Sequence, residues 1–261
     1  MSAAFLLLAV LTTAPADARI DATAFAHLSF HQHPGAQLPL RTQLRDESGR
    51  LVTLGQEFHG RPTVLVLEYL RCQNLCSLVL SGATAAMSHA RLTPGADLNL
   101  VAVSIDPRDT TRDAAASAAM YSRRFPDAAA AASGIHFLTG SPDAVAAIAG
   151  VVGFPYKLDP QTNQYAHPAG FVVATPDGHI SRYMLGLNPP AAALRDAVEQ
   201  AAHGTITPAA HPLLLLCFGY DPDAGTAAAL AIRLVRYAYL GAFAAALLLA
   251  GGFWLKRRRT A

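Results

Sequence analysis

Two cysteines four positions apart, Cys72 and Cys76, lie where a buried strand is predicted to turn into a helix. Residues 63–70 are rich in β-branched and leucine side chains, a composition typical of a buried strand. Residues 77–91 have an alanine, leucine and methionine composition that favours a helix. Thiols at such a junction lie near a helix N-terminus, where the helix dipole favours the thiolate. The pair can therefore bind a soft metal ion or cycle through a disulfide.

Strands and helices alternate along the rest of the central region. A β-hairpin is predicted over residues 39–54, a second buried strand over 98–105, and a helix over 112–124. The remaining predicted elements are a strand at 135–138, a helix starting at 141–143, a hairpin of strands at 171–174 and 180–185, and a helix at 190–202. This order indicates an α/β sandwich with a mixed sheet, and the cysteine pair after the first long buried strand narrows it to a thioredoxin-like fold with an N-terminal β-hairpin.

The two ends of the chain predict export and membrane attachment. Residues 1–18 combine a short apolar stretch with a small-x-small cleavage pattern, which indicates a signal peptide. An uncleaved anchor is the alternative, but roughly ten apolar residues are too few to span a bilayer. Residues 237–255 carry no charge and precede a basic run, which favours a transmembrane helix over a core helix. The predicted domains are a signal peptide at 1–18, a globular domain at 30–203, a juxtamembrane segment at 204–236, a transmembrane helix at 237–255 and a basic cytoplasmic tail at 256–261.

The charge pattern predicts which side of the membrane the globular domain occupies. The positive-inside rule places the basic tail in the cytoplasm, so we expect a single-pass protein of the inner membrane with its domain on the periplasmic or extracytoplasmic side. The chain has 20 basic and 18 acidic residues, and removing the four-residue basic run leaves 16 against 18. A domain without basic character is not expected to bind nucleic acid. Three cysteines in an exported chain favour chemistry over a disulfide scaffold.

A histidine far along the chain is the candidate third ligand. In a thioredoxin-like domain the loop that enters the late hairpin passes over the cysteine loop, and His167 lies in that loop. Two thiolates and one neutral imidazole form a compact soft site suited to Cu(I), whereas zinc would ordinarily need a fourth ligand. For His167 the alternative is a loop histidine without a ligand role. For the cysteine pair the alternatives are a redox-active disulfide and two inert, packed thiols.

Other polar residues have weaker claims to a functional role. Asp106 follows the second buried strand and either accepts hydrogen bonds near the site or serves as a turn or helix-capping aspartate. Cys217 lies in an apolar run, where simple burial is the favoured interpretation. Three histidines lie near the expected mature N-terminus: His27, His31 and His33. They either bind copper transiently or belong to a solvated, mobile arm, and the second interpretation is favoured.

Taken together, four sequence features resemble the Sco/SenC family over roughly residues 35–203. They are the C-x-x-x-C pair Cys72/Cys76, the stretch Val-Ser-Ile-Asp-Pro-Arg-Asp-Thr at 103–110, Phe-Leu-Thr-Gly at 137–140, and His167 followed by Phe-Val-Val-Ala-Thr-Pro-Asp-Gly at 171–178. The segment at 216–225 before the predicted membrane helix also resembles a bacterial subgroup of that family with a C-terminal anchor. Together the motifs are a specific signal for this family, whereas each motif alone would be a weak one.

The resemblance implies a copper-handling protein of cytochrome c oxidase assembly, with Cys72, Cys76 and His167 as copper ligands. Copper, as Cu(I) or Cu(II), would then be delivered to the binuclear copper centre of oxidase subunit II. The alternative is a thiol–disulfide oxidoreductase that reduces the cysteines of that acceptor through the same cysteine pair. The chain departs from the family pattern at Gln73 and Ser77, where proline usually follows at least one cysteine, and at Asn74, where an acidic residue is common.

Overall fold

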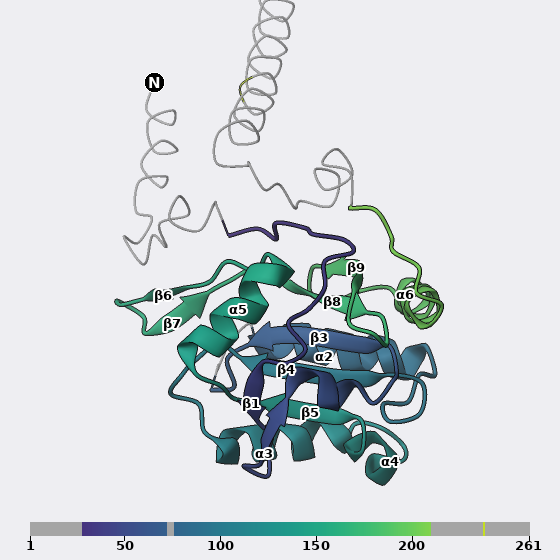
Figure 1. Cartoon of the computed structure of the whole chain (residues 1–261), viewed down its shortest axis with the longest axis horizontal. Helices are drawn as coiled ribbons and strands as arrows, with labels where there is room; N and C mark the ends of the chain where they lie inside the picture. Colours follow the sequence, from purple (N-terminus) through teal and green to yellow (C-terminus); the bar gives the residue numbers. More distant parts are fainter. Residues whose placement is uncertain (1–27, 72–75, 210–236, 238–261) are drawn as a thin grey trace, which may run out of the picture. The chain divides into compact units, whose positions relative to one another are not determined.

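A five-stranded mixed sheet with strand order β5-β4-β3-β8-β9 forms the centre of the fold (Figure 1). Strands β3 (Thr63–Glu68), β4 (Asn99–Ser104) and β5 (Ile135–Leu138) run parallel. Strand β8 (Gly170–Ala174) runs antiparallel to β3, and β9 (Ile180–Leu185) completes a hairpin with β8. The sheet confirms the predicted mixed α/β class.

The computed structural model describes residues 28–71 and 76–209 together with Tyr237, and the side chains of residues 76 and 77 are outside this description. All of the described residues except Tyr237 belong to one compact unit. The elements outside the central sheet are β1 (Gln43–Arg45), β2 (Leu51–Thr53), the 3-10 helix η1 (Leu54–Phe58), α2 (Cys76–His89), α3 (Thr111–Ser122), α4 (Ala128–Ala132), α5 (Pro142–Val152), β6 (Lys157–Asp159), β7 (Gln164–Ala166) and α6 (Ala191–Ala202).

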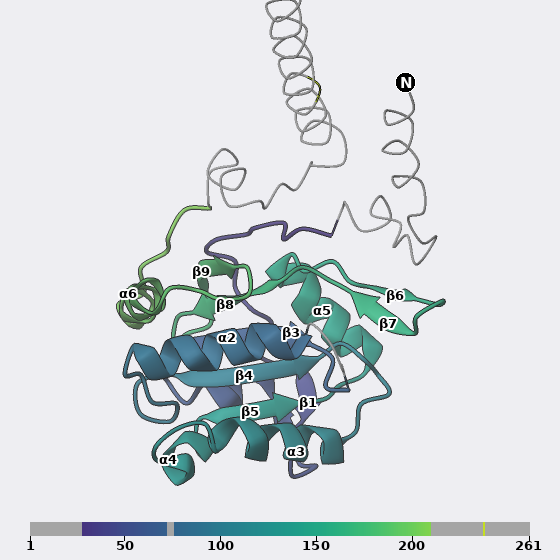
Figure 2. The ribbon, with the colours of Figure 1, turned by 180° about the vertical axis from the view of Figure 1, so that it is seen from behind.

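Both faces of the sheet are covered, which explains why its parallel strands are continuous apolar runs. Every residue of β3 and of β4 is buried. Alternate residues of β3 enter different cores: Val64 and Val66 pack with α2, α3 and α6, whereas Leu65 and Leu67 pack with α5, η1 and β1. Figure 1 shows α5 in front of the sheet, and the reverse view in Figure 2 brings α2 to the front.

One glycine fixes how closely helix α2 approaches the rest of the fold. A Cβ at Gly82 would lie 1.8 Å from the carbonyl oxygen of Leu187, in the connection between β9 and α6. Only a residue without a side chain can make this approach. The contact holds α2, and with it the backbone of Cys76 at the first position of the helix, against the α6 side of the sheet.

Most predicted elements are confirmed within a few residues of their ends. The N-terminal hairpin is present as β1 and β2, and α5 begins at Pro142 with Ser141 as its N-cap, as the sequence indicated. The sequence did not indicate the short elements η1, α4, β6 and β7. Among the described residues no helix is long and apolar enough to span a bilayer. The predicted signal peptide at 1–18, and the predicted membrane helix at 237–255 apart from Tyr237, lie outside the described residues.

Candidate metal centre

The predicted cysteine site lies at the carboxyl end of β3, where the chain leaves the sheet and enters α2. β3 ends at Glu68 and α2 begins at Cys76, so the thiol of Cys76 belongs to the first residue of a 14-residue helix. Partial positive charge at a helix N-terminus favours a thiolate over a thiol. Cys72 lies outside the described residues, as does the side chain of Cys76. The positions of the two sulfur atoms therefore stay predictions.

His167 lies on the neighbouring strand connection, at the same end of the sheet. It occupies the turn between β7 and β8, and β8 pairs antiparallel with β3 through Leu65 and Val172. The start of β8 is therefore beside the end of β3. The rings of His167 and Tyr69 meet edge to face with centroids 6.1 Å apart, and Tyr69 precedes Cys72 by only three positions.

The imidazole of His167 is held by aromatic packing and by one backbone acceptor. Its ring stacks on Phe154 at a centroid distance of 5.4 Å. Nδ1 lies 2.9 Å from the carbonyl oxygen of Pro168. In the neutral ring this hydrogen bond requires the proton on Nδ1, so the lone pair is on Nε2. This is the tautomer that a histidine needs in order to coordinate a metal through Nε2.

Burial favours the neutral form of this imidazole. It lowers the pKa of His167 below the usual histidine value, and the hydrogen bond to Pro168 offsets only part of that effect. A neutral ring does not have to lose a proton before it binds a metal ion. Phe154, Tyr69, Tyr156 and Tyr165 form a continuous aromatic cluster around it, with successive ring centroids 5.6–6.5 Å apart.

A buried aspartate holds the segment that leads into the cysteines. Oδ2 of Asp109 accepts hydrogen bonds from the backbone N–H of Leu70 at 2.6 Å and from the hydroxyl of Ser104 at 2.7 Å. Its Oδ1 accepts from Nε of Arg71 at 2.9 Å, and the Asp109 side chain is completely buried. Arg71 also donates to the backbone carbonyl of Arg108. The residue immediately before Cys72 is thereby fixed to the loop that follows β4.

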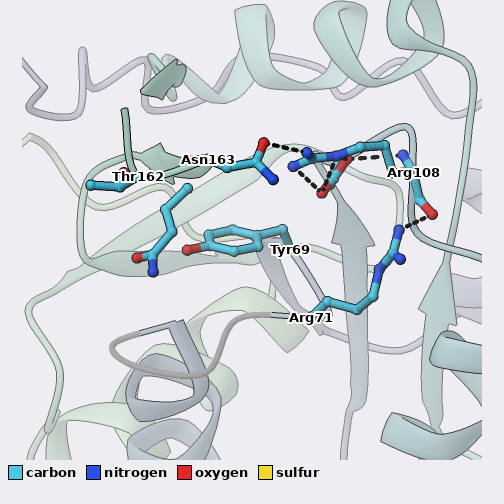
Figure 3. A pocket seen from close by; sticks show the side chains of 7 residues that line it. Tyr69, Arg71, Arg108, Thr162 and Asn163 are labelled. Carbon is cyan, nitrogen blue, oxygen red and sulfur yellow. Dashed lines mark hydrogen bonds and ion pairs between the residues drawn. The ribbon is translucent and has the colours of Figure 1, made fainter. Parts of the chain in front are cut away.

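A second ion pair, between Asp106 and Arg108, borders the same region. The Arg108 guanidinium donates to both carboxylate oxygens of Asp106, at 2.8 and 3.1 Å from Nε, and it also bonds the amide oxygen of Asn163. Burial disfavours the Asp106 carboxylate, but these hydrogen bonds outweigh it and lower the pKa of Asp106. Figure 3 shows Tyr69, Arg108 and Asn163 around a pocket of about 280 Å³, which is also lined by Arg71.

The remaining candidate residues are placed as follows. Asp106 accepts from the backbone N–H of Arg108 at 2.9 Å, so it has the turn-forming role that was one of its two interpretations. His31 and His33 are exposed, as expected for a solvated arm. The arm is not mobile at these positions, because their backbone N–H groups donate to Gly153 and Tyr183 at 2.8 and 2.9 Å. His27 and Cys217 lie outside the described residues.

The sequence alone did not indicate Asp109 or Arg71 as contributors to the site. Their interaction joins two loops separated by 38 positions, a pairing that local periodicity does not encode. The available signal was the location of both residues directly after buried parallel strands, whose carboxyl ends meet at one edge of a sheet.

The family profile for SCO1/SenC matches residues 33–203. The chain belongs to the SCO1/SenC family. The match spans the hairpin, the cysteine segment and His167, which is the region of the resemblance noted in the sequence. A comparison with curated proteins found no match.

Three solved structures illustrate the fold shared with this SCO1/SenC domain. A protein from Aquifex aeolicus VF5 is 22% identical to this chain, with a TM-score of 0.58. The alignment covers 66% of this chain and 95% of the Aquifex protein. Arabidopsis thaliana ScoI with copper bound is 22% identical to this chain, with a TM-score of 0.50. The alignment covers 66% of this chain and 98% of ScoI. BsSco is 18% identical to this chain, with a TM-score of 0.51, and the alignment covers 66% of this chain and 97% of BsSco. BsSco is described as having a disulfide switch and as a member of the Sco family of cytochrome c oxidase assembly proteins. At these identities the likeness shows the fold alone.

Proposed function

We propose that this SCO1/SenC protein binds copper through Cys72, Cys76 and His167 and delivers it to the binuclear copper centre of cytochrome c oxidase subunit II. The observation that carries the proposal is the imidazole of His167 packed against Tyr69 and Phe154, at the end of the strand that leads to the cysteines. Two thiolates and an imidazole suit Cu(I). Cu(I) is cargo in this scheme, taken up as the two thiols release their protons and passed on by exchange with ligands of the acceptor.

The proposal includes a membrane anchor at residues 237–255 and a globular domain, residues 30–203, on the extracytoplasmic side of the inner membrane. Support comes from the uncharged stretch followed by four basic residues in the sequence. Anchoring donor and acceptor in one membrane raises their effective concentration, which favours transfer by direct contact. Protease treatment of intact spheroplasts tests the topology: the globular domain should be digested, whereas its survival would contradict this orientation.

A Cu(I) titration of the reduced full-length chain against a competing chelator tests the ligand set. We expect one Cu(I) per chain, and His167→Ala should weaken binding by about 100-fold, or roughly 2.7 kcal/mol. The matched control is His179→Ala, because His179 lies in the β8–β9 turn and pairs only with Asp177 among the described contacts of its ring. Full affinity in the His167 variant would contradict the proposed ligand set.

A thiol–disulfide oxidoreductase is the second candidate function, favoured by the start of α2 at Cys76. A thiolate at a helix N-terminus is a good attacking or leaving group in disulfide exchange. In this reaction the dithiol of Cys72 and Cys76 gives two electrons and two protons to the acceptor disulfide and becomes a disulfide itself. If His167→Ala retains both copper affinity and exchange with the oxidised acceptor, the oxidoreductase function is preferred.

A further inference from the structure

A second group of metal-ligating side chains lies away from the cysteine segment. It consists of Glu57 in η1, His59 directly after η1, and His136 on the edge strand β5. One ligand atom from each of the three residues lies within 4.8 Å of the others. A single oxygen, Oε2 of Glu57, is 3.2 Å from Nδ1 of His136 and 3.8 Å from Nε2 of His59. The three donors therefore converge on one point.

Strand alternation and a left-handed residue bring these donors together. Ile135 and Phe137 point into the core beneath α3, so His136 faces the opposite side of β5, where η1 packs. His59 ends η1 with φ 45° and ψ 30°, a conformation that non-glycine residues adopt at a cost on the order of 1 kcal/mol. In this conformation its ring lies 5.7 Å from the ring of His136, centroid to centroid.

The carboxylate in this group is buried and lacks a full counter-charge. The Glu57 side chain is 7% exposed, and its ion-pair partners in the described part of the chain are the two histidines alone. A second carboxylate, Glu47, lies 3.4 Å from the same nitrogen of His136. The nearby cation Arg50 is already paired with Asp46 at 2.8 Å. The protonated ring of His136 offers one positive charge to two carboxylates, Glu47 and Glu57, and a bound metal ion would supply the missing charge.

One ring nitrogen of the group also lacks a good partner. Nε2 of His136 is buried and has no hydrogen bond of normal geometry within the described residues, although the Ser133 carbonyl contributes weakly to stabilising the protonated ring. The group forms part of the wall of an open pocket of about 470 Å³, which gives an ion access from solvent. With the ring proton on Nε2, the lone pair of His136 is on Nδ1, the nitrogen that faces Glu57.

We propose that Glu57, His59 and His136 form a thiol-free site for a divalent transition-metal ion of the Zn²⁺ type. Two imidazoles and one carboxylate are borderline and hard donors that suit Zn²⁺ when a water molecule is the fourth ligand, whereas Cu(I) prefers thiolates. The site is separate from His167, which precedes β8: β5 and β8 have two strands between them, so they lie roughly 14 Å apart across the sheet. The bound ion would link η1 to the edge strand.

The test is a Zn²⁺ titration of a full-length, tag-free chain in which Cys72, Cys76 and Cys217 are all replaced by serine. Competition with a chromogenic chelator measures the affinity, and we expect one Zn²⁺ per chain. His59→Ala removes a half-exposed ring, 48% exposed, and should weaken binding at least about 10-fold. The matched control, His179→Ala, removes a ring of similar exposure at 39% that also pairs with a single carboxylate, and it should change nothing.

A thermal melt of the same proteins provides the second measurement. Zn²⁺ should raise the melting temperature of the thiol-free chain and of its His179→Ala form, because an ion that binds only the folded state stabilises it. Glu57→Gln should lose this shift even if His59→Ala folds poorly. Absence of Zn²⁺ binding by the thiol-free chain, or equal affinity in the His59 and His179 variants, would overturn the proposal. Neither result bears on copper binding by the cysteines.

Discussion

Two groups of buried carboxylates beside the central sheet have opposite surroundings. At the carboxyl end, Asp106 and Asp109 are each bonded to an arginine and to backbone N–H groups. Toward the amino end, the ion pairs of Glu57 among the described residues are with His59 and His136. Hydrogen bonds from Arg108 outweigh burial and lower the pKa of Asp106, whereas burial outweighs the histidines and raises the pKa of Glu57.

This difference separates anions that support the structure from an anion that is available to a ligand. A carboxylate whose hydrogen bonds are complete stabilises the loops around it and gains little from another cation. A buried carboxylate with incomplete compensation raises the energy of the metal-free protein, and binding an ion relieves that cost. The four predictions below test this contrast.

The largest effect is expected at Asp109. Asp109→Ala leaves the Leu70 N–H, the Ser104 hydroxyl and Arg71 without their shared acceptor, and should lower the free energy of unfolding by about 3–5 kcal/mol. Urea denaturation of the full chain measures the change. Asp196→Ala, at an exposed position of α6, is the control and should stay within about 0.5 kcal/mol of wild type. Similar losses for both variants would show that Asp109 has no special role.

The metal preferences of the two sites should separate when one histidine is removed at a time. His167→Ala should weaken Cu(I) binding by about 100-fold and leave Zn²⁺ binding unchanged, and His59→Ala should weaken Zn²⁺ binding by about 10-fold and leave Cu(I) unchanged. Cu(I) titrations of the two variants with the cysteines present, and Zn²⁺ titrations of the same two substitutions in the thiol-free chain, give all four affinities. If either variant weakens both metals equally, the two sites are not independent and the contrast fails.

The Asp106–Arg108 pair predicts an acid-dependent contribution to stability. Because the folded-state pKa of Asp106 is below the ordinary value, its contribution is present above about pH 4 and is lost as the pH falls through the folded-state pKa. Asp106→Asn should therefore cost about 1–2 kcal/mol at pH 7 and progressively less toward pH 3. Urea titrations of wild type and variant at several pH values measure the gap, and a gap that widens on acidification would contradict this assignment.

The smallest effect is expected at Glu57 in the absence of metal. Burial already disfavours the ionised form and raises the pKa of Glu57, so Glu57→Gln removes an unfavourable charge as well as an ion pair with His136. We expect the free energy of unfolding to change by less than about 1 kcal/mol in chelator-treated protein. A loss as large as that of Asp109→Ala would mean that Glu57 is a completed structural anion like those at the other end of the sheet.

The fold was largely predictable because its main elements have strong local signals. Continuous apolar runs identified β3 and β4, and the Ser141–Pro142 start identified α5. The short strands β6 and β7 have three residues each, too few for a period to be recognised. The five-residue helix α4 is likewise too short to give a periodic signal.

The candidate sites were predictable only where position along the chain is informative. Cys76 at the start of a helix follows from the strand-to-helix change. The ring of His167 packs against Tyr69, and the passage of its loop over the cysteine segment stays a prediction. The cluster around Glu57 was not predictable, since His136 follows Glu57 by 79 positions in the sequence. His136 comes close to Glu57 because β5 pairs with β4. Long-range pairing of this kind leaves no local pattern.

The aromatic cluster around His167 has a practical consequence for optical spectroscopy. Tyr69, Tyr156 and Tyr165 are all within this cluster, and the only tryptophan in the chain, Trp254, belongs to the stretch predicted to enter the bilayer. In a fragment that ends before that stretch, the ultraviolet fluorescence would come from tyrosines alone. Three of these tyrosines belong to the cluster around His167. Capture of an ion by that imidazole should dim this emission, so cargo loading can be followed in real time without a dye.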